Sequence, residues 1–193
     1  MSSMHHPLIA TRIADHITLA ASLLEDQSFL AAVSGAAAAM ATALRNGHKV
    51  LFFGNGGSAA DAQHLAAELT GRFLRERRSL PGLALSTNTS SVTAIGNDYG
   101  FDEVFARPLS ALGAAGDIAF GLSTSGNSPN VLRAMQVAKE KQMVTVGLSG
   151  RAGKLASLVH HAICIPCEST PRIQEAHMLT GHILCEIIEA ELF

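Results

Sequence analysis

The sequence has few charged residues, a single tyrosine and no tryptophan. Charged side chains make up 16% of its 193 residues and hydrophobic ones 48%, and the formal net charge is −2. Proteins that bind nucleic acid normally present a basic face, so this balance argues against direct nucleic-acid binding. So few charged groups can cover only a small solvent-exposed surface, so we expect part of the surface to be buried in an oligomer.

Long apolar runs are also missing. No stretch reaches the roughly 18 consecutive apolar residues that a membrane-spanning helix needs, and the alanine-rich residues 35–44 are better explained as a buried helix. Residues 1–7 lack the basic and apolar regions of a signal peptide. These features predict a cytoplasmic protein that does not associate with membranes.

Cysteine is scarce and odd in number, with residues at 164, 167 and 185 only. An odd count does not suit a disulfide framework and fits a reducing compartment. Cys164 and Cys167 have C-x-x-C spacing, which also occurs in redox pairs and in halves of zinc sites. Because the pair lies along the expected last strand, where alternate residues face differently, and no second C-x-x-C follows, chance spacing is the favoured explanation.

The hydrophobic pattern indicates an α/β fold in one domain spanning residues 1–193. Two N-terminal helices are expected within about 8–46, followed by an α/β core over about 49–193. In the core, runs rich in Val, Ile, Leu and Phe alternate with helix-length segments, at residues 50–53, 82–85, 117–121, 143–147 and 161–165. This alternation predicts a five-stranded parallel sheet flanked by helices. A last helix is expected over 171–192.

Residues 123–128 lie between the third expected strand and a helix starting near Pro129, and they are dense in polar groups. The helix would present its free N–H groups and the positive end of its dipole to an anion, and the hydroxyls of this loop would supply extra donors without adding charge. One such residue would be an ordinary N-cap. The density of polar groups exceeds what a cap needs and predicts a phosphate-binding loop.

A second candidate loop, residues 54–58, is rich in glycine and joins the first expected strand to a helix. Gly54, Gly56 and Ala59 match a permissive dinucleotide fingerprint, which also calls for an acidic residue about 20 positions further on. Ser86, Thr87 and Asn88 follow the second expected strand instead. A phosphorylated sugar is therefore favoured over a nucleotide, with both loops at the carboxyl edge of the sheet.

Candidate chemical groups lie on two of the expected helices. His64 and Glu68, four residues apart on a largely apolar helix, would share one face and reach one metal ion or substrate. A simple surface pair is the competing interpretation. Gln174 and His182 are eight residues apart, which is about 12 Å along a straight helix, so spacing alone does not pair them.

Five motifs together resemble the phosphoheptose isomerase branch of the sugar isomerase (SIS) domain family, and the resemblance covers essentially the whole chain. They are residues 54–58, His64-x-x-x-Glu68 with residues 69–72, residues 96–98, residues 123–128, and residues 172–175 followed by His182. Each motif alone is weak evidence, and the combination is specific.

The resemblance implies one Zn²⁺ per subunit, held by His64, Glu68, Gln174 and His182. It also implies that Glu68 and His182 transfer protons. The implied contacts to the phosphosugar come from Asn55, Gly56, Gly57, Ser58, Glu68, Arg72, Asn97, Asp98, Ser123, Thr124, Ser125, Ser128 and Gln174. Members of this branch are homotetramers with sites at subunit interfaces. Pro171 departs from members that carry an acidic residue there, which affects the sugar contacts expected near Gln174.

By this resemblance, the chain would convert sedoheptulose 7-phosphate to D-glycero-D-manno-heptose 7-phosphate through an enediol, in bacterial heptose biosynthesis. The alternative is a non-catalytic SIS protein that binds the replication initiator. That branch lacks the glutamate and the second histidine of the site, whereas Glu68 and His182 are both present here. A sugar-phosphate sensor attached to a DNA-binding module is disfavoured, because this sequence has no room for that module.

Overall fold

A five-stranded parallel sheet forms the centre of the molecule. The computed structural model describes residues 5–151 and 153–193. The strands are β1 (Val50–Gly54), β2 (Gly82–Ala84), β3 (Ile118–Ser123), β4 (Val144–Ser149) and β5 (His161–Cys164), in the spatial order β2-β1-β3-β4-β5. The strand number, direction and approximate positions predicted from the apolar runs are confirmed.

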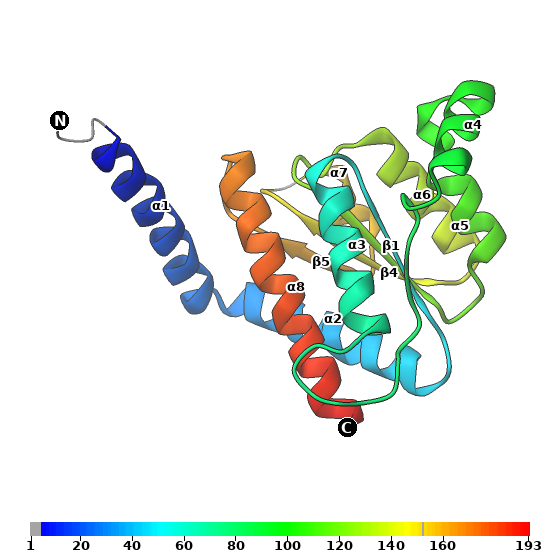
Figure 1. The fold of residues 1–193 in the computed structure, drawn as a ribbon, viewed down its shortest axis with the longest axis horizontal. Helices are drawn as coiled ribbons and strands as arrows, with labels where there is room; N and C mark the ends of the chain where they lie inside the picture. The colour runs from blue at the N-terminus through cyan, green and yellow to red at the C-terminus, as the bar shows by residue number, and fades with distance from the viewer. Residues whose placement is uncertain (1–4, 152) are drawn as a thin grey trace.

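Helices cover both faces of this sheet (Figure 1). They are α1 (His6–Glu25), α2 (Gln27–Arg45), α3 (Gly57–Thr70), α4 (Thr89–Tyr99), the 3-10 helix η1 (Phe101–Glu103), α5 (Ala106–Leu112), α6 (Pro129–Glu140), α7 (Lys154–Leu158) and α8 (Thr170–Leu192). The two predicted N-terminal helices are present as α1 and α2. Asp26 separates them, and its carboxylate caps α2 by accepting hydrogen bonds from the backbone of Ser28 and Phe29.

The core has two layers because the strands are apolar on both faces. Along β1, Val50 and Phe52 pack on one side with α2, α3 and α8, whereas Leu51 and Phe53 pack on the other side with α5 and α6. Successive side chains of a strand point to opposite faces, so a sheet covered on both sides needs an unbroken apolar run. This explains why β1 reads as four consecutive hydrophobic residues.

Helix α2 is long and apolar enough to cross a membrane, judged by length and composition alone, with a hydropathy of 1.4 over its most apolar window. Its buried side chains, including Val33, Met40 and Leu44, belong to the main core. It packs against α8 and β5. These contacts are those of a core helix, as predicted for the alanine-rich residues 35–44.

Helix α1 projects from the rest of the molecule (Figure 1). Its described buried residues are Leu19 and Leu23, near its C-terminal end. Large apolar side chains along the rest of the helix are more than half exposed, namely Leu8, Ile9, Ile13, Ile17 and Leu24. An isolated helix gains little stability from such exposed residues, so α1 presents a long unpartnered apolar stripe.

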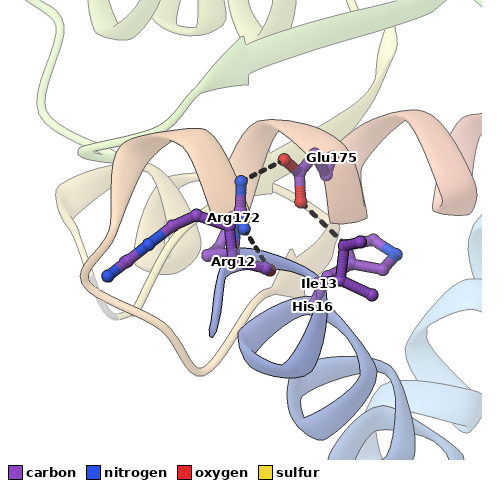
Figure 2. A pocket seen from close by; sticks show the side chains of 5 residues that line it. All are labelled: Arg12, Ile13, His16, Arg172 and Glu175. Carbon is purple, nitrogen blue, oxygen red and sulfur yellow. Dashed lines mark hydrogen bonds and ion pairs between the residues drawn. The ribbon is translucent and has the colours of Figure 1, made fainter. Parts of the chain in front are cut away.

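Polar contacts hold the start of α8 against α1 (Figure 2). Glu175 accepts a hydrogen bond from Arg172 and lies 2.8 Å from Nδ1 of His16. Arg172 also donates to the main-chain oxygen of Arg12. These residues surround a pocket of about 310 Å³ between the two helices. The clamp fixes the first turns of α8, where Gln174 lies.

Candidate active site

The two predicted phosphate loops leave neighbouring strands at the carboxyl edge of the sheet. Strand β1 lies between β2 and β3, and Gly54 at its end is paired with Leu122 of β3. From β1 the chain first crosses to β2 on one side of it, and it then returns past β1 to β3 on the other side. Ligands of open α/β sheets bind outside the carboxyl ends of strands at such a reversal.

The serine-rich loop directs its hydroxyls toward one another. Ser123 is buried at the end of β3, and its Oγ lies 2.8 Å from Oγ of Ser128 and 3.4 Å from Oγ of Ser125. Ser128 occupies the N-cap position of α6, but its hydroxyl pairs with Ser123 instead of capping the helix. At the start of α6, Pro129 has no N–H and the N–H of Val131 donates to Oδ1 of Asn130. The backbone N–H of Asn130 and the hydroxyl cluster can both donate to an anion.

Side-chain amides tie the two loops together. Asn55 of the glycine-rich loop and Asn130 in the first turn of α6 exchange two hydrogen bonds, of 2.8 and 2.9 Å. Gly56 has a φ of +54°, a conformation that favours glycine and turns the chain into α3. Ser58 is buried against Gly54. Asn55 thus has a structural role, and its contact with a sugar stays a prediction.

His64, Glu68 and His182 form one cluster, with ligand atoms that all lie within 4.8 Å of one another. Nε2 of His64 lies 3.0 Å from Nε2 of His182 and 3.2 Å from Oε1 of Glu68. The side chain of Glu68 is 21% exposed and that of His64 46% exposed. Two imidazoles and a carboxylate that converge at an accessible point can bind a divalent metal.

The cluster forms because α3 and α8 run parallel and side by side (Figure 1). His64 meets His182 across 118 positions of sequence, and Leu65 fills the space beside Gly181, where a Cβ would lie 2.5 Å from the leucine. Phe73, in the segment after α3, stacks on the ring of His182 with a centroid distance of 5.4 Å. The orientation of His182 is therefore set from two sides.

Gln174 contacts α3 closer to its N-terminus. Its amide nitrogen lies 3.5 Å from Oδ2 of Asp61, and a Cβ at Gly57 would lie 1.8 Å from that nitrogen. Asp61 precedes His64 by three residues and shares its helix face. Gln174 thus lies along the same helix pair as the cluster, and its predicted bond to a metal stays a prediction.

Asp61 was not among the sequence-predicted site residues. It is 7% exposed, and burial raises its pKa, an effect that Gln174 and His64 partly offset. Its i−3 spacing from His64 was available in the sequence, but the contact with α8 was not. Phe73 and Asn130 are also additions from the structure, because both act through residues that are distant in sequence.

Three other predicted substrate contacts are exposed side chains. Arg72 is exposed and pairs loosely with Glu76 at 3.7 Å. Asn97 and Asp98 are exposed on α4 and contact each other at 2.8 Å. Helix α4 lies on the opposite side of the molecule from α1 (Figure 1). Their contact with substrate stays a prediction.

The segment between α3 and β2 is held by a buried ion pair. Glu189 of α8, 2% exposed, accepts hydrogen bonds from the backbone of Phe73, Leu74 and Arg75 and from Nε of Arg77 at 2.7 Å. Burial acts to raise the pKa of Glu189, but these donors outweigh it and lower the pKa to about 2. The side chain of Arg77 is therefore buried, whereas Arg72, Arg75 and Arg78 of the same basic segment are exposed.

The two cysteines of the C-x-x-C motif do not form a disulfide in the described structure. Cys164, Cys167 and Cys185 are all free, and Cys164 lies 3.7 Å from the hydroxyl of Ser149. The described metal-ligating cluster contains none of them.

Comparison with known proteins places this architecture in a family. Residues 14–150 match the SIS domain family. The phosphoheptose isomerase of Solidesulfovibrio magneticus is 51% identical over 186 residues, covering 96% of this chain and 90% of the relative. The phosphoheptose isomerase 2 of Campylobacter jejuni is 46% identical, with coverage of 96% and 92%.

Two solved structures agree. The phosphoheptose isomerase of Neisseria gonorrhoeae is 42% identical, with a TM-score of 0.90 and coverage of 95% of this chain and 98% of that one. The enzyme of Francisella tularensis is 35% identical, with a TM-score of 0.91 and coverage of 98% and 100%. By these matches, the chain belongs to the phosphoheptose isomerase branch of the SIS domain family.

Proposed function

We propose that this protein isomerises sedoheptulose 7-phosphate to D-glycero-D-manno-heptose 7-phosphate, as a zinc enzyme of heptose biosynthesis. The observation that carries the proposal is the convergence of His64 and Glu68 of α3 with His182 of α8 on one point, in a fold whose serine-rich loop leaves the carboxyl edge of the sheet. Isomerisation of a phosphorylated sugar needs an anchor for the phosphate and separate groups that act at the carbonyl end.

In this proposal, the loop of residues 123–128 and the N-terminus of α6 bind the phosphate. Binding energy at that end positions the carbonyl end of the sugar. The Glu68 carboxylate accepts a proton from C1 of the ketose, which leaves a cis-enediol. Return of a proton to C2, with transfer of a proton between the two oxygens, gives the aldose. His182 carries protons to and from these oxygens.

The donor set fits zinc, since two imidazole nitrogens and a carboxylate oxygen already face one point, and Gln174 could add an amide oxygen. Bound zinc would supply Lewis-acid polarisation of the sugar carbonyl. The protein's own residues hold the geometry. Phe73 stacks on His182, and Asp61 contacts Gln174 beside the cluster.

Two variants test the assignment. Glu68→Gln keeps the shape but removes the carboxylate, and His182→Asn removes the imidazole, so turnover of sedoheptulose 7-phosphate should fall by about 10² to 10⁴ in each. Because both residues would serve one reaction centre, the double variant should be little worse than either single variant. Glu140→Gln, at the exposed C-terminal end of α6, is the matched control. Near-wild-type turnover in both single variants would refute the assignment.

Metal content is tested separately. Purified protein should contain about one zinc ion per chain, and His64→Asn should lose it together with most of the activity. Full activity in excess chelator, in protein that metal analysis finds free of zinc, would exclude a metal role and leave proton transfer to the side chains alone.

We also propose a homotetramer. The exposed apolar stripe on α1 supports it, as does the placement of Asn97 and Asp98 on α4, which lies away from α8 in the same chain (Figure 1). A second copy would cover the stripe and could bring these residues to a site. Light scattering should give four times the mass of the chain, and Ile13→Glu should lower that mass. A monomeric wild-type protein would contradict the proposal.

A further inference from the structure

A second hollow lies beside the serine-rich loop. It has a volume of about 480 Å³ and is lined by Thr124 and Ser125 on one side and by Glu168 and Thr170, before and at the start of α8, on another. Arg151, from the loop after β4, completes it. Among the described residues that line this cavity, Arg151 is the only cationic side chain.

The loop that carries Arg151 is attached to the phosphate loop on both sides of the arginine. Before it, the backbone N–H of Gly150 donates to the main-chain oxygen of Thr124 at 3.1 Å. After it, the N–H of Lys154 donates to Oδ1 of Asn127 at 3.1 Å, and the N–H of Leu155 donates to the oxygen of Gly126 at 2.9 Å.

The two loops also touch directly. Gly153 packs so closely on Gly126 that a Cβ on Gly153 would lie 2.6 Å from its backbone. Gly150 before Arg151 and Gly153 after it are therefore held against the loop whose hydroxyls face the anion.

The charge of Arg151 is only weakly satisfied by the protein. Its Nη1 lies 3.9 Å from Oε1 of Glu168, and the two side chains are 66% and 86% exposed. Exposed pairs with this separation contribute little to stability. A phosphate monoester carries close to two negative charges and accepts paired hydrogen bonds from a guanidinium, so it can replace the glutamate as the partner of Arg151.

We infer that Arg151 is a positioning residue for the phosphate end of the substrate, and that Glu168 competes with the substrate for it. The inference rests on the proposed function for the identity of the substrate, but the binding of an anion does not require turnover. Arg151 adds a long-range attraction to loop donors that carry no net charge. Glu168 lowers affinity by occupying the same guanidinium, which keeps anion binding reversible.

Inorganic phosphate is the first probe, because its binding can be measured by calorimetry without any reaction. At low ionic strength, Arg151→Gln should weaken phosphate binding about five- to tenfold, a loss typical of one partly exposed charge-assisted contact. Arg151→Lys should recover part of the affinity because it keeps the charge but not the fork. Glu168→Gln should strengthen phosphate binding about two- to threefold, because the exposed pair with Arg151 that it removes is weak.

Arg45→Gln is the matched control. Arg45 also forms a loose exposed pair with a glutamate, at 3.7 Å from Glu191, and it lies at the end of α2. This variant removes the same charge and should leave phosphate binding unchanged. Raising salt to about 0.5 M should reduce the difference between wild type and Arg151→Gln, since screening shortens the reach of the charge.

Turnover supplies the second readout. With sedoheptulose 7-phosphate, Arg151→Gln should raise KM by the same factor and leave kcat within about twofold, because the contact is equal in ground and transition states. Equal phosphate affinities for Arg151→Gln and Arg45→Gln would overturn the inference, and so would weaker binding by Glu168→Gln. If wild type does not isomerise the sugar but the phosphate results hold, the proposed function fails and the anion role of Arg151 stands.

Discussion

The buried histidine of α8 makes the stability of this protein sensitive to mild acid. His177 is fully buried, and neither ring nitrogen has a hydrogen-bond partner among the described residues. Burial lowers its pKa from 6.5 to about 4, and the nearby backbone of Ser149, outside hydrogen-bonding geometry, offsets only part of that shift. The ring is therefore neutral in the folded protein at neutral pH.

The sign and size of the effect follow from this pKa. Because the folded-state pKa lies below 6.5, the unfolded chain binds more protons between pH 6.5 and pH 4, and stability falls as pH drops through this window. One pKa unit corresponds to about 1.4 kcal/mol, so lowering the pH from 7 to 5 should cost about 2 kcal/mol through His177 alone.

His177→Leu isolates this contribution. The change removes two unpaired polar atoms from an apolar site and should leave stability at pH 7 unchanged or improved. Urea unfolding, at one fixed protein concentration with chelator present, gives the free energy of unfolding at pH 7 and pH 5. The free energy of unfolding of the variant minus that of wild type should be about 2 kcal/mol larger at pH 5 than at pH 7.

Comparing the two proteins cancels other titrating groups, including His161, whose pKa is lowered by burial and by His160. If His177→Leu and wild type lose equal stability between pH 7 and pH 5, the argument for a buried neutral His177 is wrong.

Two further predictions concern residues that support the site. Gly57→Ala should displace Gln174, whose amide nitrogen would lie 1.8 Å from the new Cβ. Turnover should fall about tenfold or more. The melting temperature should stay near that of wild type, because only the flexible end of a side chain must move. Gly35→Ala on α2, where the nearest side-chain atom is at 3.5 Å, is its control, and equal activity of the two variants would contradict the steric argument. Glu189→Gln should destabilise the fold by about 3 to 5 kcal/mol at pH 7 in urea unfolding, because Arg77 is left buried without its counter-charge. With a folded pKa of about 2, the stability that Glu189 contributes is present above pH 4.5 and lost as pH falls toward 2, so the deficit should shrink there.

The strands and loops could be predicted from sequence because their signals are local. A strand buried on both faces needs a continuous apolar run, and β1 and β3 show such runs followed directly by polar or glycine-rich loops. The parallel order then places both loops at one edge of the sheet. Physical rules that act over a few residues were sufficient for this part of the site.

The pairing of helices could not be predicted in this way. Spacing alone gave no reason to combine Gln174 and His182 with His64, since the contacts between α3 and α8 join residues more than 100 positions apart. Arg77 shows the same limit. It lies in a basic segment that reads as solvated, and only the position of Glu189, which is 112 residues away, explains its burial.

The order of residues along α8 determines how the parts of the site depend on one another. The first turns hold the clamp to α1 through Arg172 and Glu175, and Gln174 lies between these two residues. His182 lies two turns further along and is held independently, by Phe73 on one side and His64 on the other. A disturbance of α1 therefore acts on Gln174 through its immediate neighbours, whereas it reaches His182 only through the helix itself. Contacts made by α1 outside this chain would thus influence the Gln174 end of the site before the His–Glu–His cluster.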